Sequence, residues 1–190
     1  MNTAQSQDIA SASVTRGGAS VEAMEAHGRY TVECVGADGK VKWAEEFDNL
    51  VTTEGKNFLL DWGLGGTASA ISARMSFIAS GTPAATDTYA THAGFTEVAS
   101  GVIATRGTPT FSAAAAGVKQ TSTPVSASIV GTGTVTGVAI NLIAGTVGNL
   151  GVVADNATAG AKLYSAGLFA SSKSVSSGDT LNVTYSTTLT

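Results

Sequence analysis

The sequence predicts an all-β protein, an antiparallel β-sandwich or jelly-roll with one short α-helix at about residues 53–62 and an extended N-terminal arm. Short runs of strand-forming residues recur along the chain, and clusters rich in Gly, Ser, Thr and Asp separate them. Only one segment has helical spacing, whereas a doubly wound α/β fold would need several helices. A sandwich and a jelly-roll give the same pattern of short strands, so the sequence leaves the choice between them open.

Length and composition favour a single domain with an appendage. A chain of 190 residues can bury one hydrophobic core. We expect an arm over residues 1–28, because this part begins with small and polar residues that cannot form a core of their own. The rest, 29–190, is expected to be one β-rich domain, in which a hairpin and helix at 29–66 precede a strand-rich part at 67–190.

Charge is sparse and unevenly distributed. Charged residues make up 13% of the chain, about half of the usual quarter. Residues 1–62 carry ten acids and five bases, whereas 63–190 carry four acids and five bases. Because no Lys or Arg cluster occurs, neither a nucleic acid nor a membrane is an expected partner. A chain with so few charges suits a protein that packs against other proteins.

Cysteine content and hydropathy indicate a cytoplasmic origin. The single cysteine, Cys34, permits no intramolecular disulfide and fits a reducing compartment. The N-terminal residues lack the basic start and apolar core of a secretory signal. The most apolar window, 138–153, is interrupted by Asn141, Asn149 and glycines, which is typical of buried strands rather than a membrane span.

The clearest strand signal is a β-hairpin at residues 29–47. Apolar residues alternate with polar ones on both strands, at Tyr30, Val32 and Cys34 on the first and at Val41 and Trp43 on the second. Between them, Asp38 and Gly39 supply turn chemistry, since Gly accepts positive φ. The adjacent acids Glu45 and Glu46 break the alternation and predict a bulge or strand end there.

The stretch VTTEGKNFLLDWGLGG at 51–66 predicts the helix. We expect Thr53 to be the N-cap and Glu54 to interact favourably with the helix dipole. Phe58, Leu59 and Trp62 share a face, so Phe58 and Trp62 are expected to lie between helix and sheet. The glycines at 63, 65 and 66 end the helix.

Further strands are expected along the rest of the chain, with a long loop at 81–95 and a turn, SSGD, at 176–179. Their predicted ranges are 73–79, 96–104, 108–113, 124–130, 132–143, 151–154, 162–170 and 181–189. In the last of these, the residues that share one face are Leu181, Val183, Tyr185, Thr187 and Leu189.

No catalytic or metal-binding constellation is visible in the sequence. His27 and His92 stand alone, outside any spacing that would place two ligands on one metal. Cys34 falls on the apolar face of the hairpin, where a small buried thiol is the expected role. Asp87 has no second acid at the interval of a calcium loop. We therefore predict no catalytic, cofactor-binding or metal-binding residues, no cofactor and no enzymatic activity.

Three other motifs have structural explanations. The stretch GTGTVTG at 131–137 lacks the helix and the lysine of a phosphate-binding loop, so we predict strand glycines that another backbone approaches closely. The acids at 45, 46 and 48 could supply a glycosidase pair, but a solvated edge that discourages wrong strand pairing explains them more simply. Glycosylation sequons at Asn156 and Asn182 would need a secretory route.

Three stretches carry a family resemblance. They are RYTVECVGADGKVKWAEEFDNLVTTEGKNFLLDWGLGG, TPAATDTYATHAGFTEV and KLYSAGLFASSKSVSSGDTLNVTYSTTL. In this order they resemble a family of small structural proteins encoded by tailed bacteriophages and prophages. The resemblance spans about residues 27–104 and 160–190, while 105–160 matches only in its Ser, Thr and Gly character.

The resemblance implies a virion component, an accessory protein of the head or of the tail. A capsid decoration or cement protein would bind the major capsid protein on the outer face of the head, whereas a tail or fibre-associated protein would act in host attachment. Low charge and an arm that can reach a neighbour favour decoration, and the sequence shows no repeats or coiled-coil heptads of a fibre. We expect a homo-oligomer, a trimer or other symmetric cluster, on the capsid surface. Adhesive modules without a virus, and enzymes, are the remaining alternatives.

Overall fold

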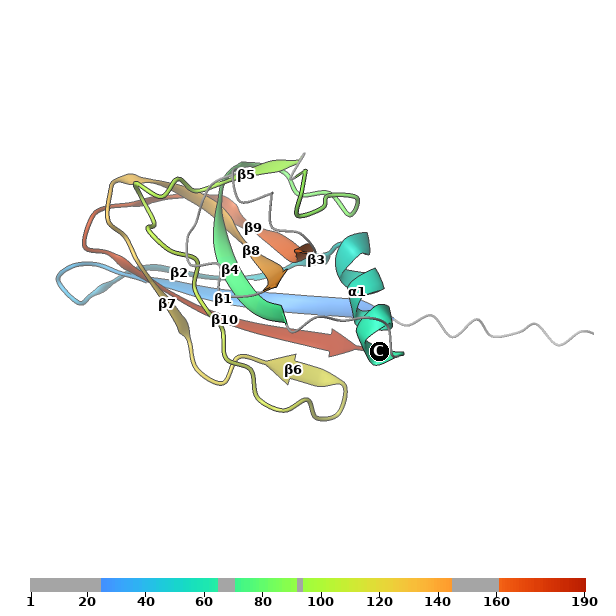
Figure 1. Cartoon of the computed structure of the whole chain (residues 1–190). Coiled ribbons are helices and arrows are strands. Elements are labelled where there is room, and N and C mark those ends of the chain that lie inside the picture. The colour runs from blue at the N-terminus through green and yellow to red at the C-terminus, as the bar shows by residue number, and fades with distance from the viewer. Residues whose placement is uncertain (1–24, 65–70, 92–93, 145–160) are drawn as a thin grey trace, which may run out of the picture.

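The chain folds into two antiparallel sheets and one short helix, in agreement with the all-β prediction (Figure 1). The computed structural model describes residues 25–64, 71–91, 94–144 and 161–190. The predicted strand at 151–154 and residues 1–24 of the predicted arm lie outside these ranges.

The first sheet is built around the pairing of the two ends of the described chain. Its strands β1 (Ala26–Val35) and β10 (Thr180–Leu189) pair over ten positions, from Ala26 opposite Leu189 to Val35 opposite Thr180. Strand β2 (Val41–Asp48) pairs with the other edge of β1. Two short strands, β6 (Val118–Gln120) and β7 (Val125–Ser128), share the free edge of β10.

The second sheet has the order β3-β9-β8-β4-β5. Its strands are β3 (Leu50–Val51), β4 (Ile71–Gly81), β5 (Phe95–Glu97), β8 (Gly133–Ala144) and β9 (Lys162–Val175). Both of its faces are covered, which explains why the central strands contain runs of buried residues instead of a clean alternation.

The two sheets bury one core between them. The first sheet contributes alternate residues of its central strands, and the second sheet contributes the facing side chains of β4 and β8, so that Tyr30, Val32, Leu181 and Val183 join Met75, Phe77, Val138 and Ile140 in one cluster. The outer face of the second sheet carries a smaller cluster, in which Tyr89 and Phe95 from the 82–95 segment cover Ile78, Ala139 and Ile143.

The chain crosses from the first sheet to the second at Asn49, between β2 and β3. The Asn49 side chain donates a hydrogen bond to the hydroxyl of Tyr185, at 2.9 Å, and its backbone N–H donates to the carbonyl of Gly28. A Cβ at position 28 would stand 2.3 Å from that hydroxyl, so this corner requires a glycine.

The predicted hairpin is confirmed, with changes at its ends. Gly39 has φ of 76° in the turn, as expected. The bulge lies between Cys34 and Val35, not at the two acids, and it leaves Val41 55% exposed where a buried face was expected. The first strand begins at Ala26, so the expected arm over 1–28 is too long by its last residues.

Helix α1 (Thr53–Gly63) is confirmed, but Thr52 and not Thr53 is its N-cap, because Thr52 accepts from the backbone N–H of Gly55. The prediction that Phe58 and Trp62 lie between helix and sheet is wrong for Trp62, which is 53% exposed. Gly55 is the buried residue of the helix, and it lies directly on the backbone of Tyr164 in β9. The helix therefore approaches the sheet through a glycine, a contact too close for an aromatic side chain.

The remaining strand predictions are mostly confirmed, at 73–79, 124–130, 132–143, 162–170 and 181–189. The prediction at 96–104 is wrong beyond Glu97, where the chain turns, and 108–113 forms an isolated bridge instead of a strand. Strand β6 was not expected from the sequence. Its VKQ run is too short to show a period, and only the edge of β10 makes it a strand.

The helix contact predicts opposite effects of the same substitution at two glycines. In Gly55→Ala, the new Cβ would lie 2.4 Å from the Tyr164 carbonyl oxygen, so we expect unfolding free energy to fall by about 1 to 3 kcal/mol. Gly63 has no atom within 4 Å of such a Cβ, so Gly63→Ala should be neutral or stabilising by up to about 1 kcal/mol. Urea denaturation measures both, and equal effects would contradict the proposed contact.

Candidate interaction surface

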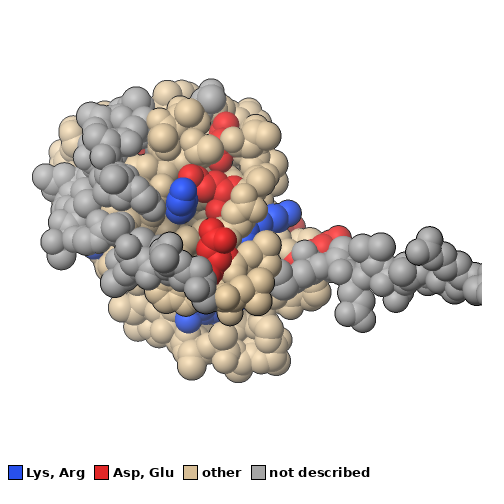
Figure 2. Space-filling model, turned by 45° about the vertical axis from the view of Figure 1, so that its right-hand side comes forward, with Lys and Arg blue, Asp and Glu red and all other residues tan. Residues whose placement is uncertain are grey.

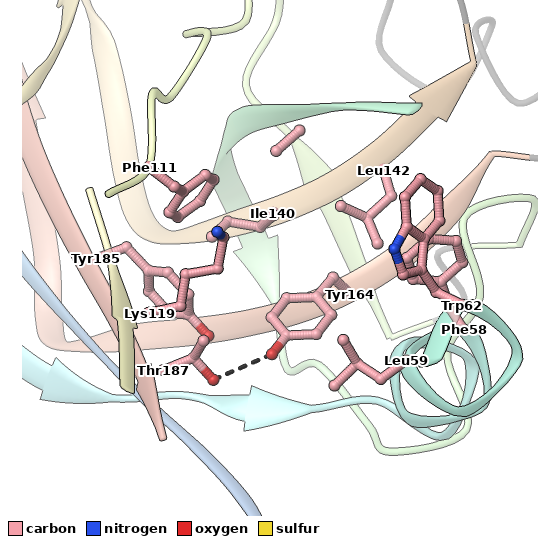
Figure 3. A pocket seen from close by; sticks show the side chains of 11 residues that line it. Phe58, Leu59, Trp62, Phe111, Lys119, Ile140, Leu142, Tyr164, Tyr185 and Thr187 are labelled. Carbon is pink, nitrogen blue, oxygen red and sulfur yellow. Dashed lines mark hydrogen bonds between the residues drawn. The ribbon is translucent and has the colours of Figure 1, made fainter. Parts of the chain in front are cut away.

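An apolar groove opens between the two sheets at the end of the molecule that carries α1 (Figure 3). We call it the end groove. It has a volume of about 430 Å³ and is open to solvent on one side. The helix contributes Phe58, Leu59 and Trp62, the second sheet contributes Ala73, Ile140, Leu142 and Tyr164, and the other side is formed by Phe111, Lys119, Tyr185 and Thr187.

The hydroxyl groups in the wall of the end groove are already paired. The Tyr164 hydroxyl and the Thr187 hydroxyl lie 3.0 Å apart, a hydrogen bond drawn in Figure 3. Thr187 also donates to the carbonyl of His27, and the Tyr185 hydroxyl accepts from Asn49. Burial raises the pKa of Tyr185, so this phenol is neutral. The wall therefore offers apolar contact more than free hydrogen-bonding groups.

Among the described residues that line the end groove, Lys119 alone carries a charge. Its ammonium group donates to the carbonyl of Ser112, at 3.2 Å, and lies 5.8 Å from the centre of the Phe111 ring. It projects from strand β6, which the sequence did not reveal. The groove is thus apolar with one cation at its side.

The outer surface of α1 extends the apolar region beyond the groove. Leu60, Trp62 and Leu64, which we call the helix tip, are 44%, 53% and 86% exposed. The rings of Phe58 and Trp62 lie 5.8 Å apart and join the helix tip to the groove wall. Large apolar side chains gathered beside an open groove mark a surface for binding other molecules. Figure 2, turned to bring this side forward, also shows acidic side chains gathered on this face.

Glu54, in the first turn of α1, holds the helix in place. Glu54 accepts hydrogen bonds from the backbone N–H groups of Tyr89 and Leu163, both at 2.8 Å, and from Lys162 at 3.3 Å. The expected role of Glu54 at the helix dipole is therefore only part of its function, because it also holds α1 to β9 and to the 82–95 segment. These hydrogen bonds fix the position of α1, which forms one wall of the end groove.

The residues weighed as chemical candidates are not brought together. Cys34 is buried as expected, and burial followed by the nearby Asp179 carboxylate raises the pKa of its thiol. His27 is exposed and pairs with Glu25, whereas His92 lies outside the described residues. Asp87 is buried and accepts from the backbone N–H of Ala84, which makes it a turn residue.

The acids of the hairpin divide between two surroundings. Glu46 and Asp48 are exposed and pair with Arg29, in agreement with a solvated edge. Glu45 instead points toward β9, where it pairs with Lys173 at 2.8 Å and accepts from the backbone of Ala170. The sequon residue Asn182 accepts from Ser126, and Asn156 lies outside the described residues.

Two of the three glycines in the 131–137 stretch behave as predicted, whereas Gly133 meets the side chain of Val102. A Cβ at Gly137 would lie 2.1 Å from the carbonyl oxygen of Gly167 on β9, and one at Gly131 would lie 2.2 Å from that of Gly101. Both glycines are therefore needed where another backbone approaches closely. The stretch is part of β8 and of the turn before it.

A buried polar network, which was not predicted from the sequence, lies on the outer face of the second sheet. Arg106 donates to one Glu97 carboxylate oxygen at 2.8 and 3.1 Å and to the Tyr89 hydroxyl at 2.9 Å. The two charged side chains are at most 3% exposed. Asn141 donates to the hydroxyl of Ser76 beside them. The interruption by Asn141 of an apolar window was the available signal, but nothing in the sequence pairs Arg106 with Glu97.

The described residues contain neither a metal-binding group nor a membrane-spanning helix. No group of His, Cys, Asp and Glu among the described residues could hold a metal ion. No helix in the described ranges is long and apolar enough to span a membrane. No family model matches the chain, and neither a curated protein nor a solved structure is detectably similar to it.

The buried ion pair predicts a large loss of stability on Glu97→Gln. The substitution removes the carboxylate charge that faces the buried Arg106 guanidinium, so unfolding free energy should fall by about 3 to 5 kcal/mol. The matched control is Glu46→Gln, which removes an exposed partner of Arg29 and should cost less than about 1 kcal/mol. Thermal and urea denaturation compare the two, and similar losses would show that the buried pair contributes no more than a surface pair.

The ion pair between Asp179 and Lys42 predicts a loss of stability in acid. Hydrogen bonds from Lys42, at 2.6 Å, and from the backbone of Ser176 lower the pKa of this carboxyl. Its stabilisation is therefore present above the ordinary pKa of about 3.9 and disappears as pH falls through the lower folded value.

We expect Asp179→Asn to reduce stability at neutral pH and to flatten the acid side of the stability curve. Asp61→Asn, at an exposed position of α1, serves as the control and should keep the wild-type acid dependence. Urea midpoints measured from neutral pH down to about pH 2 give the comparison. Parallel curves for Asp179→Asn and wild type would contradict the assignment.

Proposed function

We propose that this chain is a bacteriophage virion structural protein, a capsid decoration or cement protein that binds and stabilises the assembled head. The structural observation behind the proposal is the exposed helix tip beside the end groove, a continuous apolar surface at one end of a rigid two-sheet body. The assignment to a virion rests on the resemblance of residues 27–104 and 160–190 to phage structural proteins. In this proposal the two sheets hold the apolar surface in place, and that surface contacts the capsid.

The proposed mechanism is passive binding. The helix tip lies against the outer face of the shell, and the body bridges neighbouring subunits. Trp62 is the expected energetic centre of this contact, because tryptophans in partly desolvated pockets dominate many interfaces. Individual contacts of this size are weak, but many copies on one shell add up through multivalency.

The copy number in purified particles tests this proposal. A decoration protein is present at a fixed ratio to the major capsid protein, close to one cluster for each lattice axis, whereas a tail or fibre-associated protein follows the much lower symmetry of the tail. Quantitative gel analysis of particles separates the two. A tail-like copy number would replace the proposal with the tail alternative.

Heads that lack the protein test the surface. Added protein should raise their resistance to heat or chelators, and Trp62→Ser should weaken binding at least about tenfold. The control, Val41→Ser, also removes an exposed apolar side chain but lies in the β1–β2 turn region, away from the helix.

Deletion of residues 2–20 should weaken binding without unfolding the body. Full stabilisation by the deleted protein would rule out a role of the arm on the head.

A further inference from the structure

We propose that the end groove of one copy binds residues 10–15 of a neighbouring copy. This inference goes beyond the proposed function, because it concerns contacts between copies of this chain and requires no capsid. It joins two parts of the chain: a groove that no described segment fills, and the N-terminal residues 1–24, which precede Glu25 in the sequence.

The groove has the properties of a receptor for an extended apolar segment. Its volume of about 430 Å³ is lined mainly by aromatic and aliphatic side chains, and the Tyr164 and Thr187 hydroxyls satisfy each other. Figure 3 shows Phe111 on one side and Trp62 with Phe58 on the other, with Ile140 and Tyr164 between them. A segment that lies between such walls gains apolar contact and loses little hydrogen bonding to water.

The segment with the matching pattern is ASASVT at residues 10–15. Ala10, Ala12 and Val14 alternate with hydroxyl-bearing residues, which places the apolar side chains on one side of an extended chain. The hydroxyl groups on the opposite side would remain in water, so binding would leave no polar group buried without a partner.

The attachment point places this segment within reach. The backbone of Glu25 exchanges hydrogen bonds with Thr190, at 2.8 and 3.0 Å. Thr190 follows the groove residue Thr187 by three residues of extended chain, or about 10 Å. The nine residues 16–24 that link the segment to Glu25 can span about 30 Å when extended. The proposal requires the groove of an adjacent copy to lie inside that distance.

A neighbouring copy is a better donor than the same copy. Binding to its own groove would require the nine-residue linker to turn back over about 10 Å. A loop this short reverses direction less easily than a long flexible loop does. Between copies, the same linker would need no reversal. Each copy then offers one segment and one groove, a head-to-tail arrangement that closes into a ring of few members.

The oligomeric state of the purified full-length protein tests the inference. Sedimentation equilibrium over a range of concentrations should show a closed oligomer for the intact chain and for the control Val41→Ser. Deletion of residues 2–20 and the variants Val14→Asp and Trp62→Ser should lower the association constant at least about tenfold. Phe111→Ser, on the opposite wall, provides a second groove variant if Trp62→Ser unfolds.

A second measurement locates the contact. A synthetic peptide of residues 1–24, added to the protein lacking residues 2–20, should shift the tryptophan fluorescence to shorter wavelength. The same peptide with Val14→Asp should not, and neither should the wild-type peptide added to the Trp62→Ser protein, whose remaining tryptophan is Trp43.

Three results would overturn the inference. Oligomers of the deleted protein as stable as those of the intact chain would show that another surface joins the copies. A monomer at every concentration, with the peptide still bound, would show that the groove accepts the segment of its own chain. Absence of a peptide response would give the groove another occupant, such as a small apolar ligand. Head binding is measured in a separate experiment, on heads that lack the protein, so the proposed function has its own test.

Discussion

The pairing of β1 with β10 is the constraint on which the rest of the structure depends. Ten consecutive pairs join the first described strand to the last, so the sheet cannot close until almost the whole chain has been made. Pairing over such a sequence separation costs loop-closure entropy before it yields any contact, and the shared core of the two sheets offsets this cost. The same pairing sets Glu25 beside Thr190, three residues beyond the groove residue Thr187.

Polar side chains then fix the elements that the strand pairing leaves undetermined. Thr52 caps the helix and also donates to the carbonyl of Leu163, and Glu54 accepts from the backbone at Leu163 and Tyr89. These bonds hold α1 over the end of the second sheet. Since the closest contact passes through Gly55, the aromatic residues of the helix are free to face the groove and the solvent. The apolar end is thus a consequence of how the helix is fastened.

The buried pair of Arg106 and Glu97 performs a similar task on the other side of the second sheet. It lies beneath the 82–95 segment with Tyr89, and its charges are compensated locally. An ion pair in this position specifies one arrangement of a long loop that has little regular structure of its own. Both faces of the sheet are therefore covered. Among the described residues, Leu60, Trp62 and Leu64 form an exposed apolar group on the helix, while Val41 and Val130 are exposed elsewhere.

The strands with clear alternation or long apolar runs could be predicted from the sequence, and so could the turns at Gly39 and Gly178. Predictions failed where a neighbour decides the outcome. Strand β6 exists because β10 offers it a free edge, and 108–113 is not a strand because it makes only an isolated bridge to Thr121. Trp62 satisfies the helical spacing of a buried residue, yet Gly55 takes the contact with the sheet.

The sequence by itself determined the class of fold, one helix and the burial of Cys34, since these follow from local periodicity and residue type. The tertiary structure alone decided which residues form a surface. Phe58, Phe111, Lys119 and Tyr164 come from four separate parts of the chain and meet only because two sheets and a helix converge at one end. The spacing of residues within one segment does not predict which segments line the same groove, because that depends on the order in which the strands pair.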